Sequence, residues 1–91
     1  MKYTQAIGIR LNEILKESKL TQTAFAERSK ISRMTINGII NGRVDIVTFE
    51  NLILICETLE ISLTEFFNSP IFETKLEIMK KKKGRKIPFK S

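Results

Sequence analysis

The segment that most restricts the fold is MTINGIINGRVDIVTF, residues 34–49, in which two Asn-Gly pairs stand four residues apart among β-branched residues. An Asn-Gly pair between apolar runs is the strongest short-range indication of a β-hairpin. A hairpin turning at Asn37-Gly38 would leave its second strand only two apolar residues before the next Asn-Gly pair. The same residues also fit a short helix. A hairpin and a helix at this point would belong to proteins of different folds.

The helical interpretation agrees with more of the sequence. Ser32 is a suitable N-cap, and Gly42 suits the left-handed position that follows the end of a helix. An apolar stripe with the spacing i, i+3, i+4 lies between them, formed by Ile36, Ile39 and Ile40. Its one unfavourable feature is Gly38 in the helix interior, which costs about 1 kcal/mol relative to Ala. We therefore predict a helix from Arg33 to Asn41.

Four further helices are predicted from apolar periodicity and capping residues. Three of them span residues 5–18, 22–29 and about 49–59, with N-caps expected at Thr4, Thr21 and Thr48. The capping box S-x-x-E, which begins at Ser62, opens a short last helix that ends near Phe67. The predicted fold class is all-α, with five helices in one domain.

The chain divides into three parts. Residues 1–69 hold the helical domain, and Pro70 marks its boundary. Residues 70–79 form an extension that fits either helix or strand and is a candidate dimer contact. Residues 80–91, KKKKGRKIPFKS, lack a core pattern, and we predict a basic, disordered tail.

Composition excludes several classes of function. The chain has no His and a single Cys, so that an internal disulfide, a zinc site and a Ser-His or Cys-His nucleophile are all excluded. Cys56 stands in the apolar run NLILICETL and is expected to be a small buried hydrophobe. No run is long enough to cross a membrane, and the N-terminus does not resemble a signal peptide. We expect a soluble, cytoplasmic protein that is not an enzyme and needs no metal or cofactor.

Charge is strongly segregated along the chain. Residues 1–43 carry a net charge of +5, residues 44–79 a net charge of −6, and residues 80–91 a net charge of +7. This distribution favours a polyanionic partner on one side of the molecule.

The stretch LTQTAFAERSKISRMTINGIINGR, followed by TFENLILICETLEISLTEFF, resembles the Xre/Cro type of lambda-repressor-like helix-turn-helix domain. The resemblance covers about residues 5–67, and twenty positions match in register: Leu20, Thr21, Gln22, Phe25, Ala26, Ile31, Ser32, Ile36, Ile39, Gly42, Thr48, Phe49, Leu52, Cys56, Leu59, Ile61, Ser62, Leu63, Phe66 and Phe67. The chain departs from the family pattern at two positions. Lys30 stands where the family has the glycine of the tight turn, and Glu60 stands where it has the glycine before the last helix. A non-glycine residue in the left-handed region costs about 1 kcal/mol.

The resemblance implies sequence-specific binding of double-stranded DNA, usually as a homodimer on a palindromic operator. It assigns major-groove reading to five outward-facing residues of the third helix, Arg33, Met34, Thr35, Asn37 and Gly38. Arg33 is suited to guanine, Asn37 to adenine, and Met34 or Thr35 to a thymine methyl. Gln22 would meet a phosphate or a nearby base edge, and the phosphate contacts would come from Lys19, Asn41 and Arg43.

Three functions share this domain. The first is a transcriptional regulator, in particular a repressor. The second is the antitoxin of a toxin–antitoxin pair, whose tail wraps a toxin and whose gene adjoins a toxin gene. The third is an interaction module that has lost DNA binding. The tail itself has three interpretations: a solvated segment, an arm along DNA, or a membrane-surface patch anchored by Ile87 and Phe89.

Overall fold

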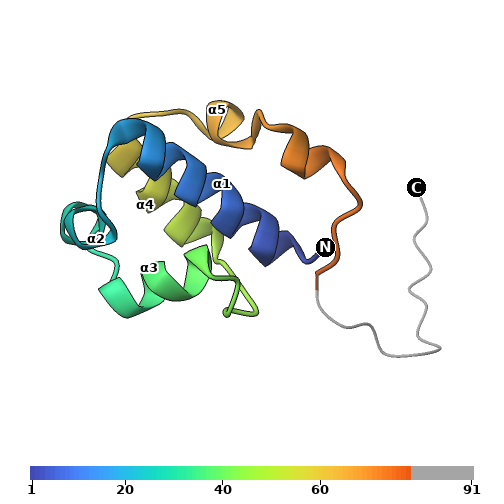
Figure 1. Ribbon diagram of the computed structural model, residues 1–91, viewed down its shortest axis with the longest axis horizontal. Helices are drawn as coiled ribbons and strands as arrows, with labels where there is room; N and C mark the ends of the chain where they lie inside the picture. Colours follow the sequence, from blue (N-terminus) through green and yellow to red (C-terminus); the bar gives the residue numbers. More distant parts are fainter. Residues whose placement is uncertain (79–91) are drawn as a thin grey trace.

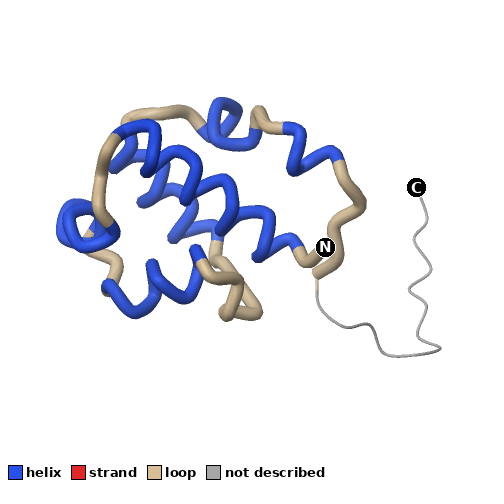
Figure 2. Tube along the Cα trace, viewed as in Figure 1, coloured by secondary structure: helices blue, strands red, loops and turns tan. Residues whose placement is uncertain are grey.

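The computed structural model describes residues 1–78, which fold into five α-helices and one short 3-10 helix (Figures 1 and 2). The elements are α1 (Tyr3–Ser18), α2 (Gln22–Ser29), α3 (Arg33–Ile40), α4 (Phe49–Leu59), α5 (Leu63–Phe67) and η1 (Pro70–Glu73). Within these residues there is no strand, only an isolated parallel β-bridge between Lys2 and Glu77. The predicted all-α, five-helix fold is confirmed. The prediction of disorder for the tail concerns residues outside those described.

The segment with two Asn-Gly pairs is helical, because α3 contains the first pair and ends on the second. Ser32 caps its N-terminus, since the Ser32 hydroxyl accepts a hydrogen bond of 3.1 Å from the Thr35 N–H. At the other end Gly42 has φ of +68° and donates to the carbonyl of Ile39, and the next N–H donates to the carbonyl of Gly38. These two bonds form a Schellman motif, which satisfies carbonyls that a helix end leaves unpaired.

The start of α1 corrects one sequence prediction. Thr4 was expected to be the N-cap, but the helix begins at Tyr3 and its N-cap is Lys2. The Lys2 N–H, which a helix would leave unpaired, donates to the side-chain oxygen of Gln5 at 3.0 Å. Thr4 is instead fully buried inside the first turn, and its hydroxyl has no hydrogen-bond partner in the described part of the chain.

Helix α1 lies between α3 on one side and the α5–η1 segment on the other (Figure 1). The buried face of α1 forms part of the hydrophobic core. The largest fully buried side chains of this core are Phe25, Phe66, Leu11, Ile36, Ile39 and Ile55. Cys56 belongs to this core, as the sequence predicted, and burial raises the pKa of its thiol. A raised pKa keeps the thiol protonated and unreactive at neutral pH.

Gly8 sets the distance between α1 and α3. A Cβ atom at Gly8 would lie 2.0 Å from the backbone oxygen of Ile39 and 3.1 Å from that of Ile40. Because no side chain can be accommodated at 2.0 Å from a backbone atom, the two helices approach this closely only with glycine at that position. Nothing in the local sequence around Gly8 indicates this contact, because α3 lies about thirty residues further along the chain.

A half-buried arginine, Arg10, fixes the opposite face of α1. The Arg10 side chain donates to the carbonyls of Phe66 at 2.7 Å and Glu65 at 2.9 Å, and it pairs with Glu13 on its own helix at 3.1 Å. The two carbonyls belong to the last turn of α5, where the helix dipole favours a positive charge. Arg10 therefore anchors the short helix α5 to α1.

Three helices end on a charged residue in the left-handed conformation. Lys19 follows α1 with φ of 59°, Lys30 follows α2 with φ of 66°, and Glu60 follows α4 with φ of 59°. The last two are the positions at which the chain departs from the family pattern. The turns are therefore built as in that pattern, and the chain carries the steric strain of a Cβ atom at each.

We expect Lys30→Gly to raise the free energy of unfolding by about 0.5–1 kcal/mol, because glycine adopts a positive φ without steric cost. For a domain of this size the melting temperature would rise by roughly 2–8 °C. Thermal unfolding followed by circular dichroism measures the change, with Lys30→Ala as a control that removes the side chain but keeps the strain. A melting temperature below that of the wild-type protein would count against this account of the turn.

We expect Gly8→Ala to lower the free energy of unfolding by about 2–3 kcal/mol, because its methyl group would overlap the backbone of α3. Urea denaturation of the variant and of Glu17→Ala, an exposed substitution on the same helix, gives the comparison. Equal stability of the two variants would contradict the close approach of the helices.

Candidate nucleic-acid interface

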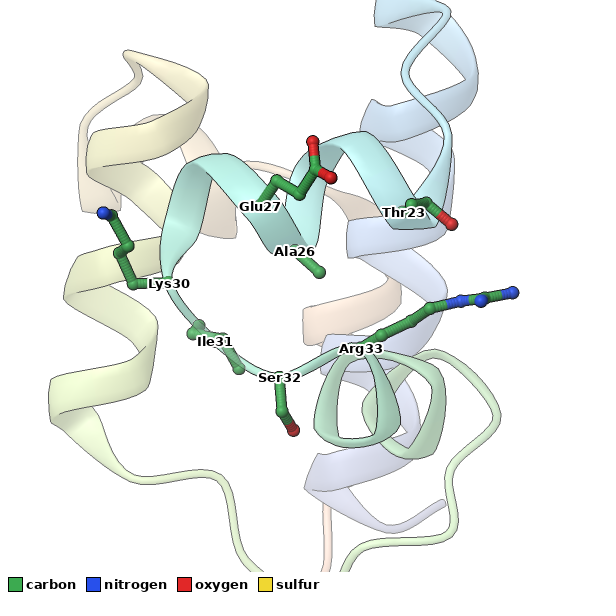
Figure 3. A pocket seen from close by; sticks show the side chains of 7 residues that line it. All are labelled: Thr23, Ala26, Glu27, Lys30, Ile31, Ser32 and Arg33. Carbon is green, nitrogen blue, oxygen red and sulfur yellow. The ribbon is translucent and has the colours of Figure 1, made fainter.

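Two capped helices and a tight turn form the centre of the candidate interface. Thr21 caps α2 by accepting a hydrogen bond of 3.0 Å from the Ala24 N–H. The turn from Lys30 to Ser32 then leads into α3 (Figure 3), and Ile31 anchors it in the core. The buried hydroxyl of Ser29 accepts the Ile31 N–H at 3.2 Å, so that the turn has little freedom to move. The angle between the two helices is thereby set by buried contacts.

The first residues of α3 point into solvent. Figure 3 shows the Arg33 side chain extending away from the turn. Met34 is 84% exposed, which is unusual for a large apolar side chain. Thr35 is half-buried, and its hydroxyl oxygen accepts a hydrogen bond of 2.9 Å from the Ser32 hydroxyl. Arg33 and Met34 are thus the two side chains that α3 presents most freely.

Four of the residues singled out from the sequence form one hydrogen-bonded network. The Asn37 amide nitrogen donates to the Gln22 side-chain oxygen at 3.1 Å, and the Arg43 guanidinium donates to the Asn37 side-chain oxygen. Asn41 joins through its amide nitrogen, which donates to the Asn37 carbonyl at 2.8 Å. Asn37 therefore connects the start of α2, the middle of α3 and the loop that follows α3.

The expectation that Gly38 faces outward is wrong. Gly38 is buried, and a Cβ atom there would lie 3.2 Å from a methyl carbon of Val44. The physical reason is the Schellman motif at Gly42, which turns the chain back so that Val44 covers this position. Lys19 is exposed at the end of α1 and has no hydrogen bond to the network among the described residues.

The loop between α3 and α4 is held by a residue that sequence reasoning missed. The Tyr3 hydroxyl accepts a hydrogen bond of 3.0 Å from the backbone N–H of Val47. Val47 is itself buried in the core, so that the loop carrying Arg43 is fixed at its far end. Tyr3 lies just before the helix predicted over residues 5–18, and nothing local to it indicates a contact between residues 44 positions apart.

Other kinds of site are not formed by the described residues. Within residues 1–78 no three His, Cys, Asp or Glu side chains are close enough to bind one metal ion. In the same part of the chain no helix has the length and apolar character needed to cross a lipid bilayer.

Comparisons with known proteins agree with this geometry. Residues 11–66 match the protein-family model HTH_3, described as helix-turn-helix. A point mutant of the restriction-modification controller protein C.Esp1396I has a similar crystal structure, with 27% sequence identity and a TM-score of 0.71, over 80% of this chain and 92% of that chain. The wild-type C.Esp1396I structure gives 27% identity and a TM-score of 0.69, over 77% and 88% of the two chains. No curated protein sequence matches the chain.

We expect Gln22 and Asn37 to be energetically coupled in the free protein, because their side chains share a half-buried hydrogen bond. A double-mutant cycle of Gln22→Ala and Asn37→Ala in urea denaturation should give a coupling energy of about 0.5–1 kcal/mol. Thr23→Ala combined with Asn37→Ala serves as the unbonded control pair. Additive effects for Gln22 and Asn37 would show that the network is not formed in solution.

Proposed function

The chain belongs to the helix-turn-helix family and is a DNA-binding regulator of transcription, and from that premise we propose a more specific function. It binds double-stranded DNA sequence-specifically, as a homodimer on a palindromic operator, and represses transcription from the promoter that it covers. The observation that carries this proposal is the N-terminal end of α3, where Arg33 and Met34 stand exposed on a rigidly capped helix.

The exposed residues of α3 are suited to base edges in the major groove. Arg33 has the planar, two-pronged donor set that pairs with O6 and N7 of guanine. Met34 offers an apolar surface for a thymine methyl group, and Thr35 lies beside it on the same helix. Gly38 adds no base contact in this arrangement, because Val44 covers it. Sequence readout therefore rests on the first turn of α3.

The network around Asn37 supports contacts to the DNA backbone. Both polar atoms of the Asn37 amide are already hydrogen-bonded, to Gln22 and to Arg43. Asn37 thus aligns these two residues for phosphates, and its pairing with adenine would require both bonds to be exchanged. Asn41 and Lys19 are the further phosphate contacts that we propose.

A two-fold dimer would place two copies of α3 in successive major grooves, about 34 Å apart along the DNA. The extension formed by residues 70–78 is the dimer contact that we propose. It packs on the domain through Phe72, while Leu76 and Ile78 remain 37% and 71% exposed. Two apolar side chains exposed at the end of the described chain are suited to a matching surface on a second copy.

One comparison favours a particular setting for the regulator. The similarity to a restriction-modification controller protein supports the proposal that this chain controls genes of such a system. A restriction endonuclease or methyltransferase gene beside its own gene would support that setting. The antitoxin alternative stays a prediction, which a neighbouring toxin gene would support in the same way.

We expect Arg33→Ala to weaken binding to the preferred duplex by about 10–100-fold, because a lost arginine–guanine pair costs about 1–3 kcal/mol of discrimination. The preferred duplex is obtained by letting the wild-type protein select from a random-sequence pool, and fluorescence anisotropy compares it with a scrambled duplex. Arg28→Ala, which removes an equal charge from an exposed position of α2, is the matched control. Equal loss on both duplexes in the Arg33→Ala variant, or no enriched sequence in the selection, would contradict the proposed function.

A further inference from the structure

We propose that Asn41 is a site of spontaneous deamidation, which places a negative charge at the edge of the surface through which α3 would meet DNA. An asparagine followed by glycine is the sequence most open to this reaction, and Asn37-Gly38 and Asn41-Gly42 are the only such pairs in the sequence. The structure distinguishes between the two pairs. The effect on DNA binding rests on the proposed function, whereas the modification itself does not.

Deamidation is an attack by a backbone nitrogen on the side chain that precedes it. The deprotonated backbone nitrogen of the glycine forms a bond to Cγ of the asparagine, and the side-chain amide nitrogen leaves as ammonia. Water then opens the resulting succinimide ring at either of its carbonyl carbons, which yields aspartate or isoaspartate. The reaction therefore consumes only water. Glycine favours the attack because it has no side chain to obstruct it and because its backbone rotates freely.

The first pair, Asn37-Gly38, is protected by its surroundings. Both residues lie inside α3, and closure of the succinimide ring requires a backbone ψ far from the helical value. The Asn37 amide is held at both polar atoms, by the Gln22 side-chain oxygen and by the Arg43 guanidinium. Gly38, which would supply the attacking nitrogen, is buried. Attack at Asn37 would therefore have to break the helix and the network together.

The second pair, Asn41-Gly42, lies past the last residue of α3. Asn41 is exposed, and it is the C-cap of the helix, with φ of −93° and ψ of 7°. Its amide nitrogen donates to the carbonyl of Asn37 at 2.8 Å, and the Gly42 N–H donates to the carbonyl of Ile39 at 3.1 Å. Bonds at a helix end open more readily than interior ones, because helix ends fray. Ring closure at Asn41 therefore needs only the last turn of α3 to open.

The strongest competing site is Asn68, which is exposed directly after α5. The residue that follows it is Ser69, whose side chain obstructs the attacking nitrogen more than glycine does. Figure 1 shows α5 and α3 on opposite sides of α1, so that Asn68 lies away from the proposed interface. Asn68 therefore serves as an internal reference for the rate of the reaction and for its effect on DNA binding.

Deamidation of Asn41 would act on DNA binding in two ways. It replaces a neutral hydrogen-bond donor by a carboxylate, two residues before Arg43, at a position that we assign to a phosphate. Isoaspartate also lengthens the backbone before Gly42, which disturbs the bonds that Gly42 and Arg43 donate to the carbonyls of Ile39 and Gly38. A duplex bound at the interface would hold the last turn of α3 closed, so that DNA-bound protein should deamidate more slowly than free protein.

The test incubates the full-length protein at mildly alkaline pH, with and without the selected duplex, and samples it over time. Peptide mapping by mass spectrometry locates each exchange of an amide nitrogen for oxygen, and fluorescence anisotropy measures the affinity of the same samples for the selected and scrambled duplexes. Asn41→Gln lengthens the side chain so that the ring closes far less readily, and its own starting affinity is its baseline. Asn68→Gln is the matched control, because it removes an exposed asparagine outside the interface.

We expect modification to accumulate at Asn41 before any other asparagine, and more slowly when the selected duplex is present. The modified fraction should bind that duplex about tenfold more weakly near 0.1 M salt, the effect of losing about one phosphate contact. During the incubation Asn41→Gln should keep its starting affinity, whereas Asn68→Gln should lose affinity as the wild-type protein does.

The other outcomes separate the modification from the proposed function. Modification at Asn37 or Asn68 before Asn41, or none at Asn41, would overturn the proposal and leave the proposed function intact. Modification at Asn41 with unchanged affinity for a preferred duplex would overturn its effect on DNA binding. Modification at Asn41 in a protein that prefers no duplex would support the site and refute the proposed function.

Discussion

The contact between the backbone of α1 at Gly8 and the last carbonyls of α3 is the constraint on which the interface depends. Because a side chain cannot be accommodated there, α1 and α3 approach each other backbone against backbone at this point. Gly42 then reverses the chain beside Gln5, and the loop returns over Gly38. Helix α3, held in this way, presents Arg33 and Met34 at a fixed angle.

Polar side chains complete what the glycine contact begins. Arg10 joins α1 to the last turn of α5, and Tyr3 joins α1 to the loop before α4. These three hydrogen bonds pair backbone groups that would otherwise lack partners at the ends of elements, so that they supply position more than net energy. Helix α1 consequently acts as the central element to which α3, α5 and the end of the described chain are all attached.

Local features of the sequence were sufficient to predict much of this fold. Thr21, Ser32, Thr48 and Ser62 cap the helices that they were expected to cap, and Lys30 and Glu60 occupy the left-handed positions. The failures involve contacts between distant residues. Gly8 could not be recognised as a packing position, because its close contact is with the distant helix α3, and nothing local marked Thr4 as buried. Gly38 was assigned to the surface from helical spacing alone, which contains no information on the loop that covers it. The candidate interface was predicted as a set of residues, but not its organisation around Asn37.

Three α-helices end on a charged residue with a positive φ, and this affects the lifetime of the protein in a cell. Strain at Lys19, Lys30 and Glu60 lowers the free energy of unfolding, whereas DNA binds only the folded state and raises it by RT ln(1 + [DNA]/Kd). Proteases that cleave transiently unfolded chains therefore remove copies that are not on DNA in preference to those that are. In such a domain the fraction bound to DNA and the turnover of the protein are coupled through the free energy of unfolding, to which these three backbone conformations contribute.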